Sequence, residues 1–454
     1  MLRVVRTAAF ILALGAAGAA AAWSNHALGT WQALSVLPEV ARATPVPAES
    51  LEHFLLAAGP ALEQVLANEE AWARANVPQY PARPDALAYR AGGDAATQRA
   101  RFLAALRINP ESKLPLFLQT RPGTEAQGRP ALPWTEVTTL RRATSARTIL
   151  FLQLREGEAV APLEVVASAS DEPDYGLDLG VWEDNDTPYG KVYGFGKQPF
   201  GSPKLEFSSQ APLHMGFFHE NWIMYKAAGF LKRTFPEYRI HLYQTLSQFA
   251  FRNGHPYWGW RFAGWALHYV QDLTQPYHAR VVPGVGTPKL LWANTADLLG
   301  FHRAKADAIT LVSNRHQALE NYQYNRMRAA YLKHADDDAL LRAARDTSTD
   351  ARYAPYNPAA IRSVVTQESH AESDATDAVL EHSLPSKYIS DPAYTMSETE
   401  AQADLYSVAT AMPVQVQEHM TAMTAGLMRH FGAHSRSFIR ALAPAPSAAN
   451  AAQR

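Results

Sequence analysis

Helical hydrophobic patterning dominates the chain from Leu213 to about residue 441, and this feature constrains the fold most strongly. Apolar side chains recur there three and four residues apart, which is the spacing of an amphipathic helix. With 454 residues, the chain is long enough to bury a large core. The pattern predicts an all-α core with helices at 213–234, 237–252, 258–273, 293–333, 337–347, 359–382 and 397–441.

The N-terminal part is less regular, and we expect a mixed excursion over about 45–170 that is an insertion or a subdomain. A short helix is predicted in 'NHALGTWQAL', and a longer one begins where Ser50 can act as its cap. Segment 147–155 is the best strand candidate, because β-branched and aromatic residues favour strands, and a helix is the alternative. Segments 120–134 and 168–212 are predicted to be long loops from their content of proline, glycine and other turn residues.

Residues 1–22 have the composition of a secretory signal peptide. Two arginines precede a short apolar stretch, and 'AAA' at 20–22 fits the small-residue pattern of a cleavage site. The stretch is short and rich in alanine and glycine for a spanning helix, so cleavage is favoured over an uncleaved membrane anchor. We expect a secreted or periplasmic protein that begins at Trp23, with one helical domain over 23–441 and a disordered tail over 442–454.

The composition excludes two kinds of site. The chain has no cysteine, so it forms neither disulfides nor thiolate metal sites. Its formal net charge is -1, so no global basic field attracts nucleic acid, and we expect no stable nucleic-acid partner. A bound zinc ion would therefore have histidine, carboxylate and backbone ligands.

The most specific motif is 'HYVQDLTQPYH', which runs from His268 to His278. His268 and Asp272 are four residues apart on a strongly apolar pattern, so they lie one turn apart on one helix face. Pro276 then ends the helix, because proline lacks the backbone donor, and the break can swing His278 back toward the helix end. A His–Asp pair at this spacing is also common as a buried hydrogen bond. The second histidine after the break favours a metal site.

Two further histidine motifs can contribute ligands. His316 and Glu320 repeat the four-residue spacing, although exposed pairs of this kind are frequent on helices. His214 follows Pro212 at what the sequence indicates is a helix start, and we favour it over His219 as a ligand.

The remaining candidate metal ligands are carboxylates and the N-terminus that signal cleavage would create. The stretch 'SDEPDYGLDLGVWEDND' is either a solvated acidic loop or the source of a ligand, and it offers Asp171, Asp174, Asp178, Asp184 and Asp186. A free α-amino group at Trp23 has a pKa near ~7.7–8, so it can deprotonate and bind a metal at neutral pH. His26 lies close to it in the sequence.

Together these elements resemble the zinc-dependent phospholipase C/P1 nuclease family. The most specific match is the spacing His268-x3-Asp272-x5-His278, and 'APLH' at 211–214 resembles the family's other histidine motif. Glu320 resembles the carboxylate variant of the phospholipase C branch. The resemblance spans residues 23 to about 325 in scattered blocks, and the gaps between motifs are longer than the family usually shows.

The resemblance implies a multi-helix core of this type that holds up to three zinc ions. The ligands of the first ion would be Asp174, His214, His268 and Asp272. The motif 'EPDYG' favours Asp174, and Asp171 and Asp186 are the alternatives for this acidic ligand. The ligands of the second would be His278, His316 and Glu320. The third would be held by the amine and carbonyl of Trp23 together with His26, and Asp272 would bridge two ions.

The resemblance also implies hydrolysis of phosphate esters. Paired zinc ions neutralise phosphate charge and lower the pKa of water, and Asp174 is the candidate general base. We expect an exported, monomeric, phospholipase C-like enzyme that acts on a phospholipid or another phosphodiester and contacts a membrane surface transiently. Two alternatives stay open: a P1/S1-type single-strand nuclease and a non-catalytic exported zinc-binding protein.

Overall fold

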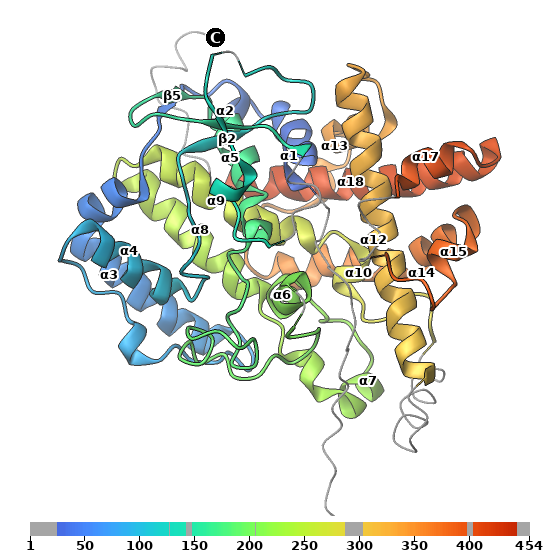
Figure 1. The fold of residues 1–454 in the computed structure, drawn as a ribbon, viewed down its shortest axis with the longest axis horizontal. Helices are drawn as coiled ribbons and strands as arrows, with labels where there is room; N and C mark the ends of the chain where they lie inside the picture. Colours follow the sequence, from blue (N-terminus) through green and yellow to red (C-terminus); the bar gives the residue numbers. More distant parts are fainter. Residues whose placement is uncertain are drawn as a thin grey trace, which may run out of the picture.

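A computed structural model describes residues 25–126, 128–141, 148–204, 206–286, 303–396 and 403–442. This part of the chain is mostly helical, which confirms the predicted all-α class (Figure 1). The predicted signal peptide, Trp23 and the tail after Leu442 lie outside the described residues. Within the described ranges, a helix with the length and apolarity of a membrane span is absent.

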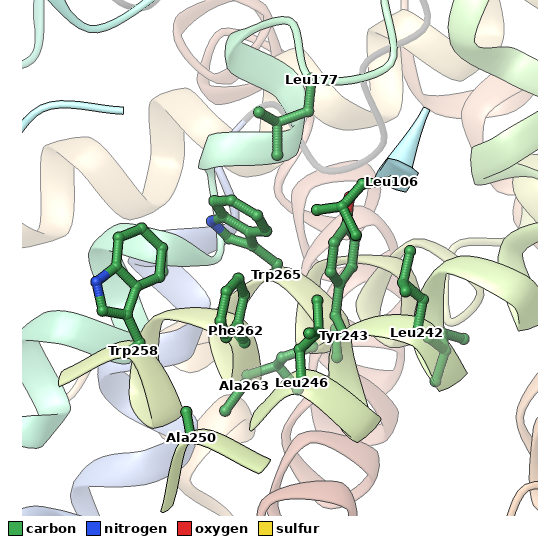
Figure 2. Close-up of a cluster of buried hydrophobic side chains, with 14 of the residues drawn as sticks. Leu106, Leu177, Leu242, Tyr243, Leu246, Ala250, Trp258, Phe262, Ala263 and Trp265 are labelled. Atoms are coloured by element: carbon green, nitrogen blue, oxygen red, sulfur yellow. The ribbon is translucent and has the colours of Figure 1, made fainter. Parts of the chain in front are cut away.

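The helical hairpin of α8 (Pro236–Arg252) and α9 (Pro256–Asp272) forms the centre of the fold. Each helix begins with a proline in its first turn, where the missing amide costs nothing. The apolar pattern of α9 covers its whole circumference, and the helix is accordingly buried from Tyr257 to its last residue. Its aromatic side chains gather with residues of α8 in one hydrophobic cluster (Figure 2).

The N-terminal excursion packs on this hairpin through α3 (Leu51–Asn76) and α4 (Ala95–Leu106), whose apolar residues belong to the same cluster. The predicted cap is confirmed, because Ser50 accepts a hydrogen bond from the backbone amide of His53 (3.3 Å). The predicted strand is confirmed over part of its length as β4 (Phe151–Gln153). The strands form two small antiparallel sheets, β2-β4-β3 and β1-β5, from β1 (Val46–Pro47), β2 (Phe117–Gln119), β3 (Ala131–Leu132), β4 and β5 (Ala159–Val160).

The other face of α9 is covered by helices from both ends of the chain. Here α1 (His26–Ser35) packs against α5 (Pro162–Ala169) and α18 (Val414–Leu442), and the latter two also contact α9. Beside them lie α10 (Pro276–Ala279), α12 (Arg303–Leu332), α13 (Ala339–Arg345), α14 (Thr366–Ser383) and α15 (Ser386–Ile389) (Figure 1). The N-terminus of the described chain is thus held in the middle of the molecule.

The prediction of one helix over 213–234 is wrong. The chain forms α6 (Glu206–His214), then α7 (Trp222–Ala227), then a short 3-10 helix at Gly229–Lys232. The reason is local, because the side chain of Asn221 accepts a hydrogen bond from the backbone amide of Met224 (3.0 Å) and starts a new helix. His214 consequently lies at the end of a helix, not at its start.

Two other helix predictions need correction. The region 359–382 starts with a π-helical segment at Ile361–Val365 before α14. The region 397–441 contains the short α17 (Leu405–Thr410) and the long α18, separated near Pro413, since a proline disfavours helical conformation in the residue before it. The predicted loop 168–212 also contains a buried 3-10 helix, η4 (Glu172–Tyr175), and most of α6.

Candidate metal centre

The predicted helix break in the main motif is confirmed. Asp272 is the last residue of α9, and the Gln275 side chain caps α10 by accepting a hydrogen bond from the backbone amide of Tyr277 (2.5 Å). Pro276 occupies the first turn of α10, where no backbone donor is needed. The reversal places His278 beside the end of α9, and both its side chain and that of Asp272 are fully buried.

The first ligand group consists of His214, His268 and Asp272. Nδ1 of His214 lies 2.8 Å from Oδ2 of Asp272 and 3.2 Å from Nε2 of His268. That Nε2 lies 3.4 Å from the same Asp272 oxygen. Four donors bound tetrahedrally to one zinc ion at ~2.0–2.1 Å are about 3.3 Å apart. The three donor atoms therefore have the spacing of ligands around one ion.

Hydrogen bonds fix which nitrogen of each histidine faces this group. Nδ1 of His268 donates to the carbonyl of Ser170 (2.8 Å), which leaves Nε2 free to bind a metal. Nε2 of His214 donates to Oδ2 of Asp178 (3.2 Å), which leaves Nδ1 free. Asp178 itself accepts a hydrogen bond from Arg239 (2.6 Å). Such outer hydrogen bonds orient metal-binding histidines and raise their basicity.

Of the three acids that the sequence leaves open, Asp174 lies beside the first group. Its Oδ1 is 3.8 Å from Nε2 of His268, and its Oδ2 is 4.0 Å from Nε2 of His26. Asp171 instead accepts hydrogen bonds from two backbone amides at the start of α1 (2.5 and 3.2 Å). Asp186 is exposed and forms part of a surface pocket. The geometry therefore favours Asp174.

A buried ion pair holds the segment that carries Asp174 against α9. Arg261 makes two hydrogen bonds of 2.8 Å to the two carboxylate oxygens of Glu172, the first residue of η4. Tyr175, at the other end of η4, donates a hydrogen bond to the Gln119 side chain. Bidentate arginine–carboxylate pairs hold the two side chains in a defined geometry and also contribute stabilising energy. Asp174 is thus presented to the centre by a segment anchored at both ends.

The second group consists of His278, His316 and Glu320. The Nε2 atoms of His278 and His316 are 3.1 Å apart, and Oε1 of Glu320 is 2.6 Å from Nε2 of His316. Nδ1 of His278 donates to the carbonyl of His214 (3.1 Å), so its Nε2 is the free nitrogen. Nε2 of Gln275 donates to Oε1 of Glu320 (3.2 Å). The predicted pair on α12 thus faces the helix break of the main motif.

His26 joins the centre from α1. Its Nε2 lies 3.2 Å from Oδ1 of Asp272, the oxygen turned away from the first group, and its Nδ1 lies 2.9 Å from Oε1 of Gln271. His26 also forms a third possible ligand group with Asp174 and His268. The carboxylate of Asp272 therefore has one oxygen toward each of two groups. Trp23, the predicted partner of His26, lies outside the described residues.

Two buried atoms of the centre fit a cation. Nε2 of His26 and Oδ1 of Asp272 are buried and face each other at 3.2 Å, and neither has a further polar partner within hydrogen-bond distance among the described residues. A metal ion bound between them would satisfy both atoms. The donor set of nitrogen and oxygen atoms also suits zinc.

The electrostatics of the centre favour the metal-binding forms of three histidines and of Asp272, whereas burial raises the pKa of Glu320 well above its usual value. Burial lowers the pKa of His278 and of His316 to about 3 and holds the pKa of His268 well below its usual value. Burial would raise the pKa of Asp272, but the neighbouring histidines hold it well below its usual range. Neutral imidazoles and an ionised carboxylate are the species that bind metal.

His26 and His214 differ from the other histidines of the centre, because nearby carboxylates raise the pKa of both against the effect of burial. Burial would lower the pKa of His214, but hydrogen bonds with Asp178 and Asp272 raise that pKa to about 10. A metal ion at Nδ1 would therefore displace a proton from His214 when it binds. His219, the alternative to His214 in the sequence, lies elsewhere and contacts the carbonyl of Arg362 (2.9 Å) through its Nε2.

The sequence did not identify the residues that hold the ligands. Asp178 was one of several acids in its loop, and no spacing linked it to Arg239, 61 residues further along the chain. Arg239 and Asp178 are both fully buried and form an ion pair. The available signal was an arginine in an otherwise apolar helical face of α8, since arginine is almost never fully buried unless paired.

Asp178→Asn is expected to weaken metal binding about 10–100-fold, because His214 loses the carboxylate that orients it. Competition with a chromophoric chelator measures this affinity on the folded protein. Tyr269→Phe is the matched control. The Tyr269 hydroxyl also donates a hydrogen bond to Oδ2 of Asp178 (2.7 Å), but this bond does not involve a metal ligand. Equal metal affinity in wild type and Asp178→Asn would show that Asp178 does not orient His214.

The described residues thus hold three groups of buried histidines and carboxylates. Two of the groups share His268, and the third is linked to them by the hydrogen bond from His278 to the carbonyl of His214. No protein-family model matches the chain, and searches of curated proteins and of solved structures found no match either. Its function must therefore be argued from the side chains of the centre.

Proposed function

We propose that the chain is an exported, zinc-dependent phosphoric ester hydrolase of the phospholipase C type. The observation that carries the proposal is that α1, η4, α6, α9, α10 and α12 bring buried histidines and carboxylates together in three groups with the spacing of metal ligands. These side chains come from elements that are spread between residues 26 and 320 of the chain.

Zinc is the metal that the donor set suits best. Histidine nitrogens combined with one or two carboxylates are its usual ligands where cysteine is absent. His214, His268, Asp272 and Asp174 would hold one ion, and His278, His316 and Glu320 another. Zinc bound in such pairs supplies Lewis acidity and lowers the pKa of water.

Asp174 is proposed to accept the proton from the attacking water. Its side chain is 11% exposed, whereas those of Asp272 and Glu320 are 0% and 2% exposed. Burial raises the pKa of Asp174 to about 7, close to the value that suits a general base at neutral pH. Gln210 donates to Oδ1 of Asp174 (3.0 Å), so Oδ2 is the oxygen that would take the proton.

Parallel assays of the zinc-loaded protein on phosphatidylcholine vesicles and on single-stranded DNA test the proposal. We expect cleavage of the lipid, no cleavage of DNA, and loss of activity in His268→Ala. His53→Ala is the matched control, because His53 is 64% exposed and belongs to no metal group. Cleavage of DNA alone would assign the centre to a nuclease. Zinc binding without turnover of either substrate would leave a zinc-binding protein without catalysis.

A further inference from the structure

A small pocket beside the metal centre is lined by positive charge and hydroxyl groups. Its volume is about 60 Å³, and its polar side chains include Asn25, Thr120, Arg121, Thr148, Tyr324 and Arg328. A water molecule needs about 10–15 Å³ of such space, so the pocket has room for a group larger than one water. Among the residues that line it, none is a carboxylate.

The pocket is connected to the metal centre through two elements. Asn25 directly precedes the ligand His26 and caps α1. On α12, the ligand Glu320 is followed at four-residue steps by Tyr324 and Arg328, which line the pocket. Residues four apart form one ridge along a helix, and eight residues rise about 12 Å. The pocket therefore lies along the same face of α12 as Glu320, further from the metal centre.

Arg328 is the distinctive group of this pocket. It is half-buried, and no hydrogen bond or ion pair connects it to any other described residue. Arg121 is instead paired with Glu164 (2.8 Å). An arginine fork presents several donors in the geometry that matches phosphate. The unpaired guanidinium, the hydroxyls and the lack of a lining carboxylate together fit a phosphate group.

A larger pocket of the described chain has a lining of mixed charge. Its volume is about 350 Å³, and its lining includes Arg141 and Lys204. It also contains two acids, Glu111 and Asp186, which oppose these positive charges. The electrostatic stabilisation of a bound anion is therefore weaker in this mixed lining than in the pocket of Arg328.

We infer that the Arg328 pocket binds a second phosphate group of the substrate, separate from the phosphate ester that is cleaved. This inference rests on the proposed function in one respect, the identity of the substrate as a phosphate ester. It names the substrate class as phospholipids whose headgroup carries an additional phosphate monoester. A 5′-phosphorylated dinucleotide offers the same chemistry from another source.

The test compares turnover of substrates with and without the second phosphate. Phosphatidylinositol 4-phosphate is compared with phosphatidylinositol in mixed micelles, and 5′-phosphorylated with unphosphorylated thymidine dinucleotide. Arg328→Gln is expected to lower kcat/KM for phosphatidylinositol 4-phosphate about tenfold more than kcat/KM for phosphatidylinositol. The effect should arise mainly from a higher KM. Arg303→Gln is the matched control, because Arg303 lies on the same helix and is 92% exposed. The same selective loss on the dinucleotides alone would overturn the assignment to lipids.

A binding measurement separates failure of this inference from failure of the proposed function. Calorimetric titration of the metal-loaded protein with inorganic phosphate is expected to show, apart from phosphate binding at the metals, one binding event in wild type and Arg303→Gln that Arg328→Gln weakens about tenfold. An unchanged isotherm in Arg328→Gln would overturn the inference even if the enzyme cleaves phosphate esters. Loss of the event in Arg328→Gln would support the pocket even if no ester tested is cleaved.

Discussion

Asp272→Asn is expected to lower kcat/KM about thousandfold, since several kcal/mol of metal-derived stabilisation of the transition state are lost. One carboxylate oxygen of Asp272 faces His214 and His268, and the other faces His26. An asparagine side chain has the same shape but carries no charge and only one oxygen. It can therefore serve at most one of the two ligand groups, and the metal content should fall with the activity.

The measurement combines steady-state kinetics with the metal content of the same sample. Asp307→Asn is the matched control, because Asp307 is a carboxylate on α12 that is 39% exposed and pairs with Arg303 on the surface. The control should retain wild-type kinetics and metal. If Asp272→Asn keeps activity within tenfold of wild type and holds the same amount of metal, Asp272 is not a ligand shared by two metal groups.

Removal of the metal is expected to destabilise the protein strongly. The ligands Asp272, His278 and Glu320 are buried. Without a cation, the cost of burying their polar and charged atoms is no longer offset by metal binding. Each ion present at a thousandfold excess over its dissociation constant contributes about 4 kcal/mol to the free energy of unfolding. Loss of two ions should therefore lower that free energy by about 8 kcal/mol.

Urea unfolding followed by tryptophan fluorescence, with and without EDTA, measures this effect. The unfolding midpoint should fall on chelation and return when zinc is added back. In His268→Ala the shift should be smaller, because this variant lacks a ligand of the first group. A midpoint that does not respond to EDTA in wild type would mean that the buried groups are held by protein contacts alone.

The sequence predicted those features of the centre that depend on local spacing. The pair His268 and Asp272 and the pair His316 and Glu320 each lie one helical turn apart, and the structure places both pairs as predicted. The break before His278 was also predictable, since Pro276 acts on the backbone next to it. Such patterns need no knowledge of the rest of the fold.

The features that depend on contacts between distant segments were not predictable in this way. Asp178 is held by Arg239 from another element, and His26 reaches Asp272 only because the start of α1 lies beside the end of α9. The end of α6 at His214 was missed because a helical pattern continues past it, whereas a cap further on starts the next helix. Tertiary context decides these points.

The metal content of the exported protein tests the central claim most directly. Elemental analysis after mild purification without chelators, together with N-terminal sequencing of the same sample, gives the number of ions per chain and the first mature residue. We predict about two to three zinc ions per chain and Trp23 at the N-terminus. A folded, correctly processed protein with no zinc, and no gain of zinc on dialysis against the metal, would contradict the account.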